Sequence, residues 1–204
     1  REFLPINHNP LTLHPSRPVA MGDFAPPVIF TEIKWAQEQA MAGVKKAIIE
    51  IWSEFAKKFG RSYKPVECYK CEDAKTLLFT MGSFSETAMT AVDRLRETGV
   101  DVGLISLRLW RPFPFEEFRT AVKDVDTILV LDRSISSGGP GGPVASEIKA
   151  ALYNESTRPK IVSFIGGLGG RDITVDGFEK IIIDGIEIAE KGSETEYEMI
   201  GVRE

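Results

Sequence analysis

The stretch TLLFTMGSFSETAMTAVDRLRETGVDVGLISL, residues 76–107, decides the fold. It begins and ends with short apolar runs, residues 76–81 and 102–107, which are typical of buried strands. Between these runs, four apolar residues recur at the spacing of one helix face: Ala88, Ala91, Val92 and Leu95. A strand, a helix and a second strand in this order predict a βαβ unit with parallel strands.

The same alternation continues downstream. Apolar runs at residues 127–131 and 160–165 predict two more strands, and successive strands lie about 25 to 35 residues apart, which leaves room for helical crossovers. Three further helices are expected to bury one face each: Phe115, Phe118 and Val122 after Pro114; Val144, Ile148 and Leu152; and Phe178, Ile181 and Ile182 from Val175 onward. The predicted fold class is α/β, a doubly wound, mostly parallel sheet of about four or five strands.

Upstream of residue 63, the chain has a different organisation. Prolines in residues 1–30 exclude a continuous helix and predict an extended connector, and residues 31–62 are assigned to a long connecting helix. Apolar residues recur at helical spacing from Thr31, the expected N-cap, to Phe59, before Gly60. Residues 63–192 are the α/β domain, in which Ser83 and Glu86 form a capping-box pattern. The acidic tail 193–204 could add an edge strand at Tyr197–Val202 or remain loose.

Composition limits the possible partners. The 204 residues carry a formal charge of -5, and no basic stripe indicates nucleic acid as a partner. No apolar run approaches the roughly 20 residues of a membrane span. The chain starts at Arg1 without the pattern of a secretion signal, so we expect a fragment of a cytoplasmic protein.

Cys68 and Cys71 have the spacing of half a zinc site or of a redox pair. No second pair accompanies them, and His8 and His14 lie far upstream, so Cys and His at usual spacings supply no four-ligand site. This favours two cysteines that flank a turn over a metal or redox role.

Three loops after predicted strands contain candidate contact residues, because ligands bind beyond the carboxyl ends of strands in open α/β sheets. Trp110 and Arg111 are residue types that are frequent at interfaces, although aromatic residues here could equally cap the sheet. The run 134–143 could form a tight packing turn or hold an anion on backbone amides; its candidate residues are Ser137, Gly138, Gly141 and Gly142. Arg171 and Asp172 could make a local contact or cap, or contact another subunit.

The motifs of catalysis are missing. The sequence offers no nucleophile beside a base, no carboxylate cluster with metal spacing, and no Gly-Asp-Gly stretch followed by Asn such as holds a magnesium diphosphate. We therefore assign no catalytic, cofactor-binding or metal-binding residue. The residues alone indicate a noncatalytic α/β module.

Several stretches in order along nearly the whole chain resemble the C-terminal half of the alpha subunit of pyruvate:ferredoxin oxidoreductase and the related 2-oxoacid:ferredoxin oxidoreductases. They are Arg1–Pro5, Pro18–Gly22, Phe59–Tyr63, Cys71–Ala74, Met81–Ser83, Leu107–Pro114, Leu131–Arg133 and Gly167–Asp172. The resemblance implies that residues 63–192 are a domain like the C-terminal domain of transketolase. It also implies that the connector and long helix arrive from a pyrimidine-binding domain.

The resemblance further implies an enzyme complex that decarboxylates a 2-oxoacid, pyruvate in the first place, makes acyl-coenzyme A and reduces ferredoxin. It implies thiamine diphosphate, magnesium and iron–sulfur clusters in the complete complex, none of them bound by this fragment. The implied partners are the remaining alpha-subunit domain and beta, gamma and delta subunits or equivalent domains. Trp110, Arg111, Arg171 and Asp172 would then contact neighbouring domains or subunits.

Two alternatives remain open from the residues. One is a free-standing binding module that uses residues 136–142 as an anion or nucleotide cradle. The other is the corresponding domain of a transketolase-like enzyme or of a 2-oxoacid dehydrogenase component.

Overall fold

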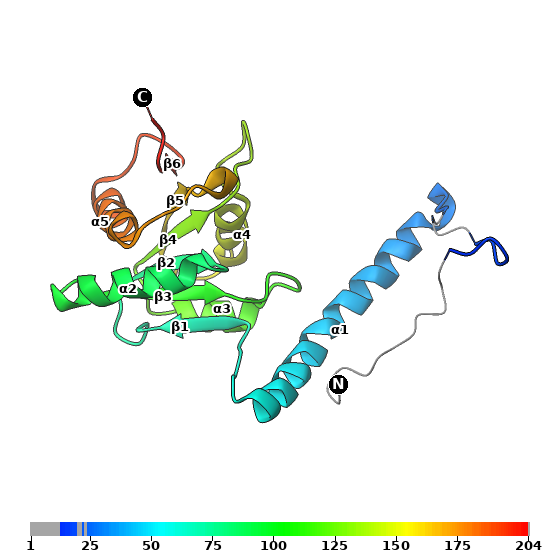
Figure 1. The fold of residues 1–204 in the computed structure, drawn as a ribbon. Coiled ribbons are helices and arrows are strands. Elements are labelled where there is room, and N and C mark those ends of the chain that lie inside the picture. The colour runs from blue at the N-terminus through cyan, green and yellow to red at the C-terminus, as the bar shows by residue number, and fades with distance from the viewer. Residues whose placement is uncertain (1–12, 20–21, 23, 204) are drawn as a thin grey trace. The chain divides into compact units, whose positions relative to one another are not determined.

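The computed structural model describes residues 13–19, 22 and 24–203 (Figure 1). The prolines Pro5 and Pro10 of the expected connector therefore lie outside the described residues, as do the segment Arg1–Pro5 and part of Pro18–Gly22. The chain divides into two compact units, Arg1–Ala42 and Gly43–Glu204. The first contains a turn in which the N–H of Arg17 donates to the carbonyl of His14 at 2.9 Å, and the first part of helix α1 (Pro27–Phe59).

Six strands form one sheet in the second unit, in the order β1-β3-β2-β4-β5-β6. Their bounds are β1 Val66–Tyr69, β2 Thr76–Met81, β3 Val102–Leu107, β4 Thr127–Asp132, β5 Lys160–Ile165 and β6 Glu198–Met199. Strands β2 to β6 run parallel to their neighbours, and β1 is antiparallel to β3. The predicted mixed α/β class and the mostly parallel sheet are confirmed.

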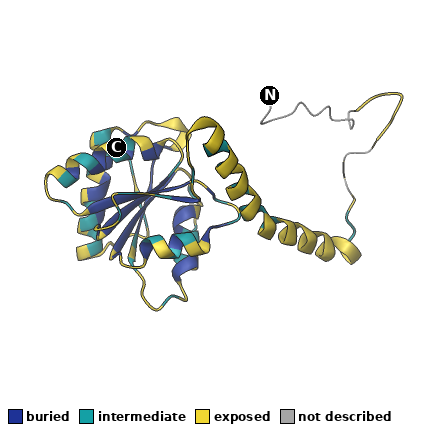
Figure 2. Cartoon of the chain, turned by 90° about the horizontal axis from the view of Figure 1, so that it is seen from below, coloured by how far each residue is buried: buried dark blue, intermediate teal, exposed yellow. Residues whose placement is uncertain are grey.

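The crossover helices cover both faces of the sheet (Figures 1 and 2). Their bounds are α2 Phe84–Glu97, α3 Phe115–Val122, α4 Pro143–Leu152 and α5 Val175–Lys191, with a short 3₁₀ turn at Leu168–Gly170. Helices α3 and α4 pack on one face around Phe79, Phe118 and Ile148. Helices α2 and α5 pack on the other face, around Leu129 and Phe178. Alternate strand residues serve the two layers, because successive side chains point to opposite faces.

The sheet has six strands, where about four or five were expected. Residues 66–69 were not predicted as a strand, because Val66–Tyr69 is short and its buried position is confined to one residue. At the other edge, Glu198 pairs with Phe164 and Met199 with Ile165, and the N–H of Ile200 donates to the carbonyl of Ile165 at 2.8 Å. Of the two alternatives for the tail, the edge strand is the one that the structure shows.

One predicted helix start was wrong, and one predicted capping box is not formed. Helix α1 begins at Pro27. Proline has no N–H group, but an N–H at the first helical position would have no partner within the helix, so proline is well suited to this position. The carbonyl of Pro26 accepts from the N–H of Phe30 at 3.1 Å. Thr31 therefore lies inside the helix. Ser83 is the N-cap of α2, as predicted, but the bond of the capping box is absent, because Ser83 has helical torsion angles and its side chain makes no cap bond. The carbonyl of Gly82 accepts from the N–H of Ser85.

Candidate functional site

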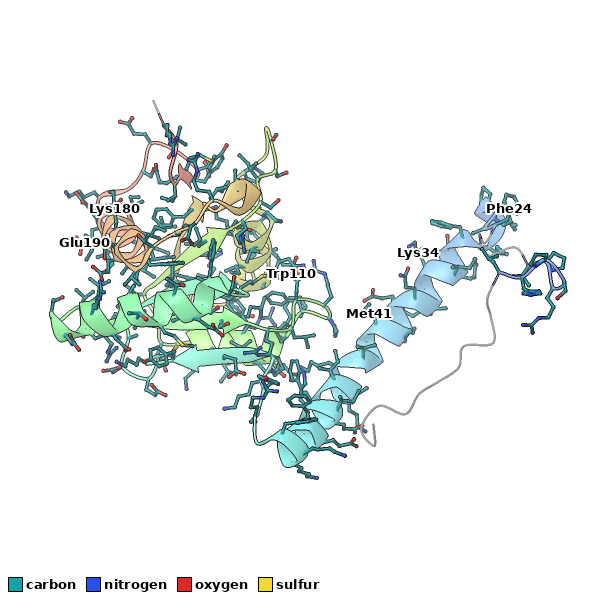
Figure 3. The ribbon with its side chains drawn as sticks, viewed as in Figure 1. Phe24, Lys34, Met41, Trp110, Lys180 and Glu190 are labelled. Atoms are coloured by element: carbon teal, nitrogen blue, oxygen red, sulfur yellow. The ribbon has the colours of Figure 1, made fainter. Side chains whose placement is uncertain are left out.

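The predicted contact residues lie in the loops that follow β3, β4 and β5. Because parallel strands end at the same edge, these loops share the carboxyl edge of the sheet. Trp110 and Arg111 follow β3, the glycine-rich run follows β4, and Arg171 and Asp172 follow β5. Figure 3 labels Trp110 in the first of these loops.

The loop after β3 is held by aromatic packing. Trp110 is half-buried and contacts Phe113 edge-on at 6.0 Å between ring centroids, and Phe113 contacts Phe118 of α3 at 5.6 Å. The guanidinium of Arg111 lies over the Trp110 ring at 4.5 Å and remains exposed. The indole therefore packs on the aromatic side chains at the sheet edge, and it also holds the guanidinium of Arg111 by a cation–π contact.

Arg111 also connects this loop to helix α4. Its Nη2 donates to Oε2 of Glu147 at 2.6 Å. Glu147 lines a shallow cavity of about 580 Å³ together with Phe115 of α3 and Ser136 and Pro140 of the glycine-rich loop. The groove is thus lined by α3, α4 and the loop after β4, and the loop after β3 is linked to it through the bond from Arg111 to Glu147. Sequence reasoning did not single out Glu147, because a lone glutamate on a helix gives no signal.

The glycine-rich loop divides into an exposed tip and a buried base. Ser137 and Gly138 are exposed, whereas Gly141 and Gly142 are buried. The N–H of Ser136 donates to the carbonyl of Gly141 at 3.0 Å and closes the loop. A loop closed in this way is consistent with the packing-turn alternative.

An internal carboxylate occupies the N-terminus of α4. Oδ1 and Oδ2 of Asp132 accept from the N–H groups of Val144 and Ala145 at 2.9 and 3.0 Å. Burial of the carboxyl raises the pKa of Asp132, and these two backbone hydrogen bonds act in the opposite direction. Because both amides are already used, they are not available to an anion from solution, which weakens the anion-cradle alternative.

Arg171 and Asp172 do not line the groove over α4, and each makes a contact elsewhere. Arg171 donates through Nη1 to the carbonyl of Gly201 in the C-terminal tail. Asp172 accepts from the N–H of Ile173 at 3.0 Å, and Thr174 rather than Asp172 caps α5 by accepting from Gly177. Both side chains are on the exposed surface, at the end of the edge that β6 completes.

Arg133 makes a cation–π contact with Phe84 that the sequence did not indicate. The guanidinium of Arg133 is 4.4 Å from the Phe84 ring centroid, and Phe84 packs edge-on against Phe178. A Cβ on Gly167 would be 2.5 Å from the Phe84 ring, so only glycine fits there. The start of α2 therefore contacts the loops after β4 and β5 through the side chain of Phe84.

The described residues do not fit the metal groups that the resemblance implies. Within these residues, no three or more His, Cys, Asp or Glu side chains come together in a group that could hold a metal ion. A cubane cluster needs four thiolates, and the whole sequence has two cysteines. None of the helices in the described part of the chain has the length and apolarity needed to span a bilayer.

Residues 74–178 match the family model for pyruvate:ferredoxin oxidoreductase core domain II. The chain is 38% identical over 192 residues to pyruvate synthase subunit PorA of Pyrococcus abyssi, covering 94% of this chain and 48% of that protein. It is 39% identical over 193 residues to ketoisovalerate oxidoreductase subunit VorA of Pyrococcus horikoshii, covering 94% and 49%.

Among solved structures, the 2-oxoglutarate:ferredoxin oxidoreductase of Magnetococcus marinus matches with a TM-score of 0.47 and 20% identity, over 64% of this chain and 21% of that chain. The chain spans about half the length of the curated relatives it matches.

Proposed function

The chain belongs to the pyruvate:ferredoxin oxidoreductase family, and we propose that it is the assembly-mediating C-terminal half of the alpha subunit of a 2-oxoacid:ferredoxin oxidoreductase. The match to core domain II over residues 74–178 carries this proposal. The complete enzyme would decarboxylate a 2-oxoacid, form acyl-coenzyme A and reduce ferredoxin.

Within this proposal the chain divides as 1–30 connector, 31–62 connecting helix, 63–192 α/β domain and 193–204 tail. The thiamine diphosphate, magnesium and iron–sulfur clusters of the enzyme would be held by the rest of the complex. For the metals, the support is that no three or more His, Cys, Asp or Glu side chains come together within the described residues. The role of this half is then to position other domains and subunits in the cytoplasm. Exposed Arg111, Arg171 and Asp172, with Trp110 beneath, are the proposed contacts.

The substrate class is a 2-oxoacid, with pyruvate as the proposed member. The relatives are named after enzymes that act on 2-oxoacids, which supports the class. The chain is 38% identical to a pyruvate synthase subunit and 39% identical to a ketoisovalerate oxidoreductase subunit. Overall identity therefore does not separate the two substrates. The test must compare them directly.

The experiment is purification of the native protein from its source cells, with its intact mass, its co-purifying subunits and its 2-oxoacid-dependent reduction of a viologen dye as readouts. We expect a polypeptide about twice as long as this chain, since the relatives extend that far, with partner subunits and dye reduction. Pyruvate, 3-methyl-2-oxobutanoate and 2-oxoglutarate are compared. A free chain without partners and without dye reduction would contradict the proposal.

The interface role is tested separately by Arg111→Ala in the complete enzyme. Arg158→Ala is the matched control, because Arg158 is also exposed, lies 5.9 Å from an aromatic ring and donates to a backbone carbonyl, but before β5 at the opposite edge. If Arg111 is a contact of hot-spot strength, subunit affinity falls at least about tenfold. Equal affinities of the two variants, measured by sedimentation velocity, would remove Arg111 from the interface.

A further inference from the structure

Cys68 and Cys71 lie on either side of a turn that several other residues hold, and both line one cavity of about 440 Å³. Cys68 lies in β1, opposite Ile105 of β3, and β1 ends at Tyr69. Lys70 has a φ of 52°, and this left-handed conformation turns the backbone after Tyr69. The sulfur of Cys71 then returns to 3.2 Å from the carbonyl oxygen of Leu104, the residue beside the partner of Cys68.

The two residues between the cysteines are anchored to helix α2. The Tyr69 hydroxyl donates to Asp93 at 2.8 Å, and Nζ of Lys70 lies 2.5 Å from the same carboxylate. Nη1 of Arg96 donates to the carbonyl of Lys70 at 3.3 Å. A Cβ on Gly103 would lie 2.5 Å from that carbonyl oxygen, so glycine is needed there. Contacts from α2 and β3 therefore fix the turn, and the turn fixes the positions of Cys68 and Cys71.

The two thiols differ in access and in acidity. Cys68 is exposed and borders two cavities of about 610 and 440 Å³, whereas Cys71 is half-buried and packs on the core around Phe79. A hydrogen bond from Cys71 lowers the pKa of Cys68 to about 7, against the opposing effect of burial. The same hydrogen bond, and burial, raise the pKa of Cys71.

Charged groups around the pair are mixed in sign. Lys64 lowers the pKa of Cys68, and Glu72 and Glu67 raise it. Other ionisable residues line the same two cavities as Cys68. In the cavity of about 610 Å³ they are Tyr63, Glu67, Tyr69, Glu86 and Arg108. In the cavity of about 440 Å³ they are Cys71, Glu72, Asp73, Lys75, Lys123 and Asp124. Acidic residues outnumber basic ones in this set, so the neighbouring thiol, rather than the surrounding charges, is the main cause of the lowered pKa.

We propose that Cys68 and Cys71 form a redox-active dithiol that exchanges with disulfides, Cys68 being the attacking and Cys71 the resolving residue. The Cys68 thiolate attacks one sulfur of a disulfide R–S–S–R, so that an S–S bond to Cys68 forms, the original S–S bond breaks and RS⁻ leaves and takes up a proton. Cys71 then loses its proton and attacks the Cys68 sulfur, releasing the second RS⁻. Overall, the two cysteines are oxidised to a disulfide and R–S–S–R is reduced to two thiols.

The test uses the full chain, glutathione disulfide and intact mass, which is unambiguous because the sequence contains no other cysteine. We expect the unmodified chain to form an internal disulfide without retained glutathione. Cys71→Ser should stop at a glutathione adduct on Cys68. Cys68→Ser should form an adduct at least about tenfold more slowly, because Cys71 is half-buried and less acidic.

A second readout needs no variant. Alkylation of the reduced chain as a function of pH, followed by peptide mapping, should label Cys68 first, with half-maximal rate near pH 7 rather than near the value of about 8.5 for an ordinary thiol. In Cys71→Ser the midpoint should move up if Cys71 is the cause. The proposal is overturned if both thiols of the unmodified chain stay reduced in glutathione disulfide, or if that chain accumulates the adduct as Cys71→Ser does.

Discussion

Asp132 and Gly142 depend on each other at the start of helix α4. Asp132 is 1% exposed and its carboxylate spans the first two amides of the helix. A Cβ on Gly142 would lie 2.1 Å from Oδ2 of Asp132, well inside van der Waals contact. The glycine is thus required by the close approach of a carboxylate from its own chain.

Gly142→Ala is expected to destabilise the protein by about 1 to 3 kcal/mol, because the methyl group forces the Asp132 carboxylate away from its two donors. Urea unfolding of the two chains measures the change. The control is Gly43→Ala, at a position in α1 where a Cβ meets nothing within 4 Å. There alanine should stabilise by about 0.5 to 1 kcal/mol, since it is the better helix former. A neutral Gly142→Ala would contradict the packing argument.

The buried carboxyl of Asp132 should also make the free energy of unfolding depend on pH. Its pKa in the folded protein is raised from the ordinary 3.8, mainly by burial, so the folded state holds this proton more tightly than the unfolded state. The resulting stabilisation is fully present below pH 3.8 and is lost as the pH rises through the folded-state pKa.

Asp132→Asn removes this titration. The difference in unfolding free energy between the unmodified chain and Asp132→Asn should therefore decrease as the pH rises above 3.8, as urea unfolding at several pH values would show. An increase over the same range would mean that the bonds from Val144 and Ala145 outweigh burial and lower the pKa instead.

At the scale of elements, the central strands were predictable, whereas β1 was missed and β6 was only one of two alternatives for the tail. Residues 76–81, 102–107 and 160–165 have the predicted bounds, because strands buried on both faces read as continuous apolar runs. Strand β1 has one buried residue of four, so hydrophobicity gives no comparable signal. Strand β6 depends on pairing with β5 far away in the sequence, which no local pattern reports.

Residue type identified candidate loops, but it did not give their contacts. Tryptophan next to arginine marked the loop after β3, and the structure adds the link from Arg111 to Glu147, 36 positions away. For the glycine-rich run, the sequence left a packing turn and an anion site open. Only the fold shows that Asp132, which precedes the run, fills the N-terminus of α4.

Strand β6 should contribute measurably to stability. Deleting residues 193–204 uncovers the edge of β5 and removes Ile200 from its contact with the core around Phe178. We expect a loss of about 1 to 3 kcal/mol in urea unfolding, from one half-buried aliphatic side chain and a few backbone hydrogen bonds. A chain that ends at Gly201 retains β6 and the acceptor for Arg171, and is the matched control. Equal losses in both truncations would show that β6 does not stabilise the sheet.

For the whole molecule, the hydrophobic core lies within a limited part of the sequence. All of the buried core side chains in the described part of the chain fall between Val66 and Ile182. Helix α1 has 33 residues and no buried residue among them, and Figure 2 shows it mostly exposed. The core side chains thus come from a continuous segment, and α1 contributes only half-buried contacts, such as the edge-on packing of Trp52 on Tyr63 at 6.4 Å.

A chain restricted to residues 61–204 should consequently fold by itself, as the proposed domain boundary near residue 63 requires. We expect one cooperative urea transition, with a stability lower than that of residues 1–204 by no more than about 3 kcal/mol. The reduction reflects the lost contacts of Trp52 and Phe55 with Tyr63 and the half-buried Lys45–Glu117 ion pair, each worth about 1 kcal/mol or less. Loss of cooperative unfolding would place the boundary inside α1 instead, because the half-buried residues of its second part would then be essential to the core.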